Sequence, residues 1–447
     1  MASSYIKRTF GAPTDQNKWT FSGWVKLGQA TTDSVIFSAG TNASNNIDGI
    51  KMDTQSLRVF SYPGSYVYHL ISDRKFRDLS GWYHVQVAYD SDQGTAADRV
   101  KCYINGTQLT GFSTESYPSS GANSGHINLN GREHIIGSDT GGANNNIDGY
   151  VTHCHFADGQ AYAPTVFGET DSTSGIWKPK TAPTVTYGNN GFFLKFENSA
   201  ALGTDSSGNG NNFTVNGTPT QSPDTPSNNF CVINPLDTYY FENSDFSNGN
   251  LTVSGNNSSF TFCTSTLGVS AGKWYMEAKL SAAASGGSRI GVVGRTSTAL
   301  NEGLGDRQDE IAHQTNGDLK VNGTTTSSWG STWTVGDIIG IALDLDNNKI
   351  YFSKNGTYQA SGNPSTAANG VTITAADSTT DGVYRFGFGD NNSTGTSTFQ
   401  YNFGSGFFGT TAVASANADG NGIGAFEYAV PTGYYAVCTK NIKEFGG

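Results

Sequence analysis

Short stretches in which apolar and polar residues alternate run through the chain, and clusters of Gly, Asn, Asp and Ser separate them. In the first third the alternation is clear in residues 19–40, 81–90 and 147–162. The stretch 100–111 also contains Asn105-Gly106, a pair that tolerates positive φ and strongly favours a β-hairpin. A period of two is typical of strands that bury one face. These residues therefore predict a block of antiparallel strands.

A second block begins with KWYMEAKL (273–280) and RIGVVGR (289–295). Its centre is GDIIGIALDLDNNKIYFSKNG (336–356), and it ends with YRFGFGD (384–390) and FQYNFG (399–404). Strong helix formers rarely recur at helical spacing, so we expect almost no long helix. The two blocks predict an all-β protein with two tandem antiparallel β-sandwich, or jelly-roll, domains.

The expected domain limits follow from changes in composition. We predict the first sandwich at residues 1–182 and the second at 237–409. Residues 183–236 are rich in Gly, Asn, Ser and Pro and contain one credible strand, at 192–196. Because polar turns cannot build a core of their own, we interpret this segment as a connector. Residues 410–447 are expected to form a C-terminal tail with one strand.

The charge balance narrows the range of partners. The chain has 37 acidic and 26 basic residues, a formal net charge of -11. This charge repels phosphate backbones and anionic membrane surfaces, so nucleic acid is not an expected partner. The N-terminal MASSYIKRTF lacks the apolar core of a signal peptide, and no apolar stretch is long enough to span a membrane. We therefore expect no export signal and no membrane insertion.

The five cysteines are an odd number and show no C-x-x-C spacing. A disulfide framework or a zinc site is therefore not favoured, and the thiols are expected to be reduced and buried. They are Cys102, Cys154, Cys231, Cys263 and Cys438.

Each block resembles a known family. FSGWVKLG, GWYHVQVAYD, VKCYINGTQL and IDGYVTHCHFADGQAYAPTVFGE, in this order, resemble the laminin-G or concanavalin A-like lectin/glucanase superfamily. KWYMEAKL, WTVGDIIGIALDLDNNKIYFSKNG and YRFGFGD resemble a SPRY domain. The joining stretches FGETDSTSGIWKPK and GFFLKFENSAALGTDSSGNGNNFTVNG are similar to connectors of structural and fibre-like proteins from tailed, especially marine, bacteriophages.

The resemblance implies sandwiches whose faces and loops recognise carbohydrate or protein. It implies a non-enzymatic virion structural protein, assembled in the host cytoplasm, with other virion proteins as partners. We expect a tail or capsid fibre or receptor-binding subunit that is homo-oligomeric and recognises host-surface polysaccharide. The first alternative is a capsid or tail decoration protein that cements neighbouring subunits. A glycan depolymerase is the more distant alternative.

Two groups of residues have spacings that could suit catalysis or metal binding. Glucanases of this superfamily carry the pattern E-x-D-x-x-E, which here corresponds to Asp344, Asp346 and Lys349. A lysine cannot replace the carboxylic acid that donates a proton to the glycosidic oxygen, so we interpret the two aspartates as part of a hairpin. His153 and His155 have a spacing compatible with metal ligation, but two ligands do not complete a zinc site. No catalytic residue is predicted.

Sugar binding needs an aromatic platform for the apolar face of a pyranose, with polar groups beside it. The candidate loop aromatics are Tyr62, Tyr66 and Tyr68 in SYPGSYVYH, and Trp329 and Trp333 in SSWGSTWTVGD. Three other tryptophans lie in alternating stretches and are expected in the cores: Trp24, Trp82 and Trp274.

No cofactor is required by any of these functions, although calcium is a candidate ligand. Oxygen-rich side chains suit calcium, and they gather at Asn46 and Asp48 and again at Asn146 and Asp148. Turn formation alone also selects Asn and Asp, so both interpretations stay open.

Overall fold

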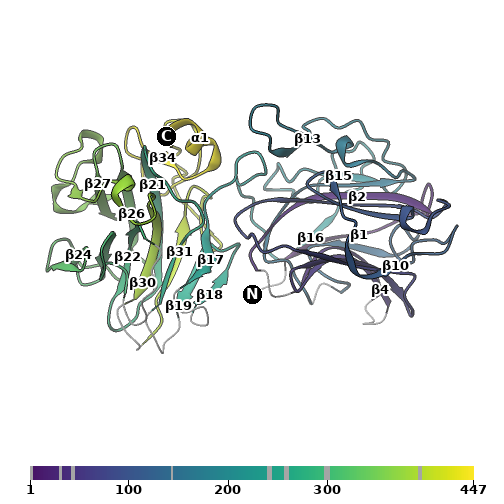
Figure 1. Ribbon diagram of the computed structural model, residues 1–447, viewed down its shortest axis with the longest axis horizontal. Coiled ribbons are helices and arrows are strands. Elements are labelled where there is room, and N and C mark those ends of the chain that lie inside the picture. The colour runs from purple at the N-terminus through teal and green to yellow at the C-terminus, as the bar shows by residue number, and fades with distance from the viewer. Residues whose placement is uncertain are drawn as a thin grey trace. The chain divides into compact units, whose positions relative to one another are not determined.

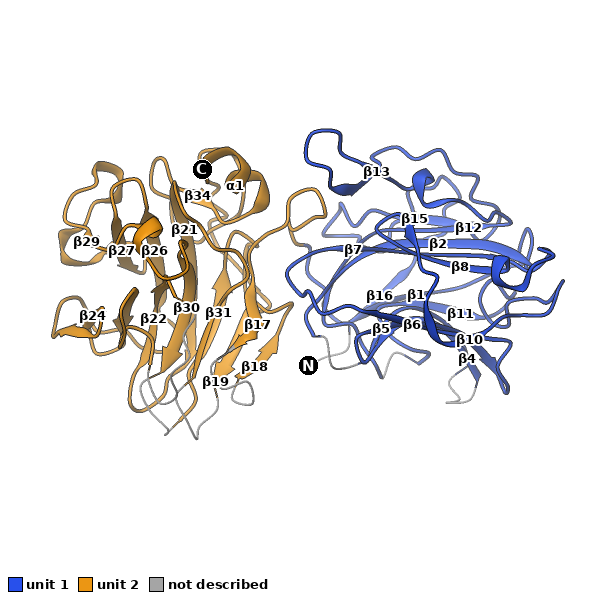
Figure 2. Ribbon diagram, viewed as in Figure 1, with its two compact units in different colours: residues 1–221 blue, residues 222–447 orange. Residues whose placement is uncertain are grey.

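Within the described residues, the regular secondary structure of the computed structural model is almost entirely β-strand (Figure 1). Clustering of contacts divides the chain into unit 1, Met1–Gln221, and unit 2, Ser222–Gly447 (Figure 2). The predicted all-β class with two antiparallel sandwiches is confirmed. In the part of the chain that is described, no helix is long and apolar enough to cross a membrane. The described residues are 4–29, 33–41, 46–141, 144–238, 244–255, 261–295, 303–390 and 395–446.

Unit 1 contains two large antiparallel sheets and one small one. The eight-stranded sheet has the order β10 (Phe112–Ser116), β6 (Tyr68–Lys75), β5 (Ser56–Pro63), β4 (Asn46–Asp53), β3 (Ser34–Gly40), β11 (Glu133–Ile136), β1 (Tyr5–Thr9), β16 (Thr214–Asn216). The six-stranded sheet has the order β15 (Phe192–Leu194), β12 (Gly149–Asp158), β2 (Lys18–Leu27), β7 (Tyr83–Asp90), β8 (Val100–Ile104), β9 (Thr107–Gln108). The small sheet pairs β13 (Gly168–Thr170) with β14 (Trp177–Pro179).

Alternation along the strands builds the core of unit 1. Leu57 and Val59 of β5 belong to this core, as do Phe21 and Val25 of β2. The residue between Leu57 and Val59, Arg58, faces away from it, as a pleated strand requires. The turn between β8 and β9 confirms the predicted hairpin, because Asn105 and Gly106 have φ values of 49° and 78°.

The predicted connector does not stand apart from unit 1, contrary to the expected boundary at residue 182. Its strand β15 pairs with β12, and β16 pairs with β1. Asn190 is buried and accepts the Gly11 N–H at 2.9 Å. Its own N–H donates to Asp158 at 3.1 Å, and its amide donates to Asn128 at 3.1 Å. These distant polar contacts fix the segment, and nothing in its local composition indicates them.

Unit 2 also contains two large sheets. The seven-stranded sheet has the order β17 (Ile233–Thr238), β20 (Phe262–Ser265), β30 (Arg385–Asp390), β22 (Ser288–Val293), β23 (Glu310–Gln314), β24 (Leu319–Val321), β25 (Thr324–Thr326). The other sheet has the order β18 (Ser244–Ser247), β19 (Thr252–Gly255), β31 (Thr398–Asn402), β21 (Lys273–Ala282), β26 (Ile338–Asp344), β27 (Lys349–Lys354), β28 (Thr357–Tyr358), with β29 (Val371–Thr372) on β27 and β34 (Tyr435–Ala436) on β21. A two-stranded sheet joins β32 (Phe407–Phe408) and β33 (Thr411–Ala412).

The predicted tail is an integral part of unit 2. Strand β34 adds to β21 in parallel, and α1 (Thr439–Phe445) follows it. The carboxylate of Glu277, on β21, is buried and accepts the N–H groups of Glu427 at 2.8 Å and Tyr428 at 2.9 Å. Burial raises the pKa of Glu277 to about 7, although these hydrogen bonds oppose the rise. The tail therefore completes the fold of unit 2.

The cysteine prediction agrees with the structure. All five thiols are buried and none is in a disulfide. Burial raises the pKa of Cys102 and of Cys154 to about 12, so these thiols stay protonated at neutral pH.

Replacing Asp158 should destabilise unit 1. Its buried carboxylate accepts N–H groups from Thr14, Asp15 and Asn190 and the amide of Asn128. Asp158→Ala leaves these donors without their acceptor, and we expect a loss of about 3 kcal/mol in the free energy of unfolding. Urea unfolding followed by tryptophan fluorescence measures this change.

The exposed Asp92 provides the matched control. Asp92→Ala should change the free energy of unfolding by less than about 0.5 kcal/mol. Equal effects of the two substitutions would contradict the anchoring role of Asp158.

Candidate functional site

The outer face of the eight-stranded sheet in unit 1 carries a cluster of aromatic side chains. On β5, Phe60 and Tyr62 alternate with Val59, which belongs to the core, and therefore point away from the core. On β6, His69 lies between core residues Tyr68 and Leu70 and points away in the same manner. Phe60 and His69 are direct partners in the β5–β6 register. Two neighbouring strands thus place these rings on one face.

Tyr66, in the β5–β6 turn, extends this cluster toward solvent. Its ring stacks on His69 with a centroid distance of 4.2 Å and an interplanar angle of 6°. Tyr62 meets Tyr66 edge-on at 4.6 Å. Tyr66 is 46% exposed, so one of its surfaces is available to a ligand. We call Phe60, Tyr62, Tyr66 and His69 the aromatic platform.

Arg58 fixes the orientation of the platform. It donates from Nη2 to the Tyr66 hydroxyl at 2.9 Å and from Nε to Nε2 of His69 at 3.0 Å. It also donates to Asp53 at 2.9 Å, and its guanidinium lies 4.6 Å from the centre of the Phe60 ring. A planar guanidinium with several donors suits this role, because it can hold three partners in fixed directions.

The protonation states of His69 and Asp53 are consistent with this arrangement. Burial, with the positive charge of Arg58, lowers the pKa of His69, so its neutral ring accepts the Arg58 N–H. Burial raises the pKa of Asp53, but the hydrogen bond and charge of Arg58 and the charge of Lys51 outweigh it, and the net pKa is lowered. At neutral pH the neutral imidazole of the platform thus lies beside the Arg58 guanidinium, which in turn binds an ionised Asp53 carboxylate.

The structure brings together only part of the predicted aromatic set in unit 1. Tyr62 and Tyr66 meet in the platform, but Tyr68 is wrong as a ligand-binding candidate, because its side chain is fully buried in the core. Strand parity explains the error, since Tyr68 begins β6 with its side chain on the inner face. The sequence reasoning missed Arg58 and His69, which the same parity would have placed beside Tyr62.

The predicted aromatics of unit 2 do not form an open platform. Trp333 is 3% exposed and belongs to the core, so the expectation that it binds ligand is wrong. Trp329 is half-buried and packs edge-on against His313 and Phe352. Of the tryptophans expected in the cores, Trp24 and Trp274 are buried and Trp82 is half-buried.

The candidate calcium residues hold loops in the structure. Asp48 is buried and accepts the N–H groups of His126, Ile127 and Tyr62. Burial raises its pKa to about 7, against the effect of these hydrogen bonds. The side-chain oxygen of Asn46 lies 2.6 Å from Nε2 of His126.

The other pair lies near the start of β12. The backbone oxygen of Asp148 accepts the Gly28 N–H at 2.7 Å, and its carboxylate accepts the Gln29 amide at 3.3 Å. Asn146 also interacts with another group of the structure. Across the described residues, no three His, Cys, Asp or Glu side chains are grouped to hold a metal ion. Calcium binding by these four residues stays a prediction.

A buried Ser-His pair lies on the outer face of the six-stranded sheet of unit 1. Oγ of Ser22 lies 2.8 Å from Nε2 of His84. The indole of Trp177 donates to Nδ1 of His84 at 3.0 Å, and burial lowers the pKa of His84 to about 3. The neutral ring therefore carries its proton on Nε2 and donates it to Ser22. A general base needs a lone pair at that position, so this pair cannot activate the serine.

A β-bulge in β12 lies at His153 and separates it from His155; these are the two histidines whose spacing is compatible with metal ligation. His153 has a φ of 47°, and the register with β2 shifts between Thr152 and His155. Nδ1 of His155 bonds the Tyr187 hydroxyl at 2.9 Å, and Nδ1 of His153 bonds Oγ1 of Thr152 at 3.0 Å. Each imidazole is thus bound to a neighbouring hydroxyl.

The aspartates of the β26–β27 hairpin serve the hairpin itself. Asp344 is buried, pairs with Lys273 at 3.0 Å and accepts the Asn347 N–H at 3.0 Å. Asp346 accepts the Gly272 N–H at 3.0 Å, and Lys349 donates to Thr372. These contacts agree with the hairpin interpretation and leave no pair of carboxylates facing a substrate.

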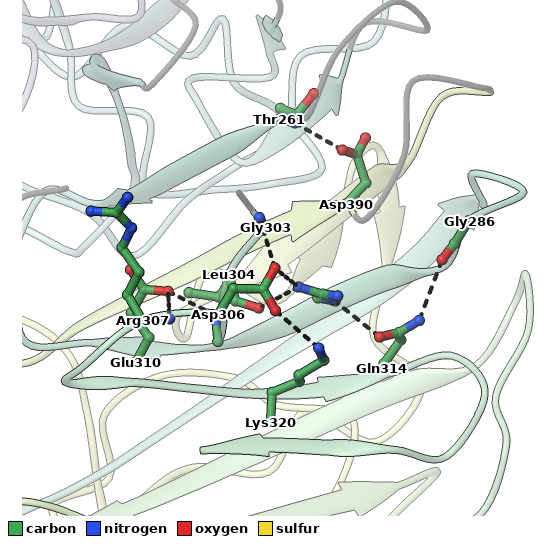
Figure 3. Close-up of polar contacts among 12 residues, drawn as sticks. Thr261, Gly286, Gly303, Leu304, Asp306, Arg307, Glu310, Gln314, Lys320 and Asp390 are labelled. Carbon is green, nitrogen blue, oxygen red and sulfur yellow. Dashed lines mark hydrogen bonds and ion pairs between the residues drawn. The ribbon is translucent and has the colours of Figure 1, made fainter. Parts of the chain in front are cut away.

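Unit 2 contains a buried ionic cluster around Arg289 of β22. Arg289 is 1% exposed and donates to Asp306 at 2.7 Å, to the Leu304 carbonyl at 3.1 Å and to Gln314 at 3.1 Å. Lys320 donates to the second oxygen of Asp306 at 2.9 Å (Figure 3). The cluster fastens the loop before β23 to the sheet.

Two family models match the chain in the order of its units. The laminin-G model described as the concanavalin A-like lectin/glucanases superfamily matches residues 2–163. The SPRY domain model matches residues 273–401. The chain carries a laminin-G/concanavalin A-like domain followed by a SPRY domain.

Among solved structures, the chain is similar to the SPRY domain of human HERC1, with 18% identity over 38% of this chain and 96% of that chain and a TM-score of 0.31. A second human SPRY domain has 16% identity over 34% of this chain and 90% of that chain, with a TM-score of 0.26. A "putative carbohydrate binding protein" from Bacteroides ovatus has 16% identity over 49% of this chain and 58% of that chain, with a TM-score of 0.34. At these scores the structures add nothing to the two family matches.

Arg289 should be essential for the stability of the SPRY-containing unit. Arg289→Ala removes the donor from buried Gln314 and Leu304 acceptors and leaves Asp306 with less compensation. Removing one partner of a buried ion pair costs about 3–5 kcal/mol. Thermal unfolding should show a clear decrease in the melting temperature of unit 2.

Arg385, which pairs with Asp381 at 2.7 Å near the surface, is the matched control. Arg385→Ala should cost less than about 1 kcal/mol. If Arg289→Ala were equally mild, the cluster would not have the anchoring role described.

Proposed function

We propose that the chain is a non-enzymatic glycan-binding protein that uses the aromatic platform of its concanavalin A-like domain. The observation that carries the proposal is the exposed ring of Tyr66, held by its stack on His69 and its hydrogen bond from Arg58. An aromatic ring fixed in this manner offers a flat surface for the apolar face of a sugar. Little conformational entropy is then lost on binding.

Polar groups beside the platform support the same function. The Tyr62 ring lies beside Tyr66, and Arg58, which donates to the Tyr66 hydroxyl, also donates to the Asp53 carboxylate. Hydroxyl-rich ligands need such donors and acceptors to fix their orientation. The combination suits a carbohydrate better than a purely apolar ligand.

The chemistry of two groups of residues, the Asp344–Lys349 hairpin and the Ser22–His84 pair, supports the non-enzymatic part of the proposal. Lys349 stands in place of the third acid, Asp344 is buried in a hairpin, and the His84 proton faces Ser22. Retaining glycosidases need two carboxyl groups facing one cleft at about 5 Å separation. The hairpin does not provide two such carboxyl groups, and the Ser22–His84 pair contains none.

The proposed biological setting is the virion of a tailed bacteriophage, where the chain serves as a tail or capsid fibre or receptor-binding subunit. The resemblance of the joining stretches to connectors of phage structural proteins supports this setting. Many copies on one particle, with homo-oligomerisation, would turn weak sugar contacts into firm attachment to host-surface polysaccharide. Other virion proteins would then be its assembly partners.

Substitution of Tyr66 tests the proposal. On an array of purified bacterial surface polysaccharides, we expect the full chain to bind at least one polymer saturably, without release of reducing sugar. Tyr66→Ala should weaken this binding at least about tenfold, on the order of 1.4 kcal/mol, because the stacking surface is lost.

Tyr103→Ala is the matched control, since Tyr103 is a half-buried tyrosine on β8 of the other sheet. It should bind as the unchanged chain does. Binding unaffected by Tyr66→Ala would refute the platform, an absence of binding to any polymer would favour the decoration role, and release of reducing sugar would refute the non-enzymatic function.

The platform also predicts a pH dependence. Because the pKa of His69 is lowered below 6.5, the neutral acceptor for Arg58 persists through neutral pH. Polysaccharide affinity should therefore be constant from about pH 8 to 6.5 and fall only as the pH decreases further and His69 becomes protonated. Titration of binding between pH 8 and 4.5 measures this, and His69→Gln, which cannot be protonated, should remove the decrease.

A further inference from the structure

An open groove of about 570 Å³ lies in unit 2, and its lining includes none of the candidate site residues described above. One wall contains Tyr358 and residues 361–365, and the other contains residues 429–432. The second wall lies beyond the SPRY match, which ends at residue 401. The groove is therefore formed jointly by the SPRY domain and the segment that follows it. Its volume is in the range of small-ligand sites.

The first wall is held in a strained and well-bonded loop. Ala360 and Ser361 have φ values of 49° and 58°, which side-chain-bearing residues rarely adopt. Asn363 and Ala368 exchange backbone hydrogen bonds of 2.9 and 3.1 Å. The Gln359 side chain accepts the Ser331 N–H and donates to the Thr357 carbonyl, both at 2.8 Å. Strain of this kind persists only where the surroundings enforce it, and it is concentrated at ligand sites.

The second wall is fixed at both ends by buried carboxylates. Just before it, Glu277 accepts the N–H groups of Glu427 and Tyr428. Just after it, Asp419 accepts the Ala436 N–H at 2.9 Å. The Tyr434 hydroxyl lies 3.5 Å from the Pro364 carbonyl, which links the two walls. The groove is thus organised before any ligand enters.

The chemistry of the lining is neutral and mixed. The lining residues include no Lys, Arg, Asp or Glu. Apolar surface comes from the ring of Tyr358 and from Pro364, Val430 and Pro431. The polar side chains are exposed to solvent, and they are Ser361, Asn363, Ser365 and Thr432.

We propose that this groove is a second binding site in the chain, for a neutral saccharide residue. The prolines and Tyr358 would contact the apolar face of the sugar ring. The amide and three hydroxyls, which face solvent in the free chain, would bond its hydroxyl groups. The site is separate from the aromatic platform and does not depend on it.

Two other ligand classes fit the groove less well. A phosphate or a uronic acid would find no counter-ion in the lining, and the net charge of -11 opposes anions in general. A charged peptide side chain would likewise enter a neutral site at the cost of its hydration. A neutral, hydroxyl-rich ligand meets neither cost.

The test uses the full chain carrying Tyr66→Ala, so that the aromatic platform does not contribute. Saturation-transfer NMR with glucose, galactose, mannose and N-acetylglucosamine, each at millimolar concentration, should give transfer to at least one sugar. Glucuronic acid should give a weaker signal than the best neutral sugar. Adding Ser365→Trp, which fills the groove from an exposed position, should abolish the transfer.

Ala368→Trp is the matched control, because Ala368 is exposed in the same loop but does not line the groove. It should keep the signal, whereas Asn363→Ala should weaken affinity roughly three- to tenfold by removing one amide partner. The proposal is overturned if no neutral sugar gives transfer, if Ser365→Trp leaves the signal unchanged, or if glucuronic acid binds more strongly. If Tyr66→Ala weakens binding on the polysaccharide array while the sugar signal of the groove persists, the loss of binding is due to the aromatic platform alone.

Discussion

Buried carboxylates that accept N–H groups hold the irregular parts of this protein to its sheets. Asp158 gathers segments from three regions of unit 1, and Glu277 holds the C-terminal segment in unit 2. With 37 acidic and 26 basic residues, at least 11 acidic groups have no cation to pair with, and Asp158 and Glu277 are compensated by N–H donors instead. Without these anchors, the sheets would lack the long segments that complete their edges and walls.

A fixed support underlies both proposed recognition surfaces. The aromatic platform stands on strand faces, where parity and Arg58 fix the direction of each ring. The groove of unit 2 depends on loops, and Glu277 and Asp419 give one of those loops a comparable rigidity. Rigid support matters for sugars in particular, because each contact is weak and a disordered site would lose more entropy than it gains.

Local patterns in the sequence predicted the strands, the hairpins and the all-β class, because those depend on side-chain alternation and turn residues. They did not predict that Asn190 and Glu427 join the compact units, since each depends on a carboxylate distant in the sequence. The candidate site was found in part. Tyr66 is a loop aromatic as expected, but Tyr68, expected in the same loop, begins β6 and lies in the core. Arg58 has no unusual local motif that could reveal its role.

The anchoring of the irregular segments through their backbone has an evolutionary consequence. Glu277 and Asp419 bind the main-chain N–H groups of Glu427, Tyr428 and Ala436, so the side chains at those positions are not part of the anchor. Any residue except proline can supply the same donor. A lineage of such proteins can therefore diversify the surface between the anchors, residues 429–432 among them, and acquire new ligand preferences while the two sheets beneath stay unchanged.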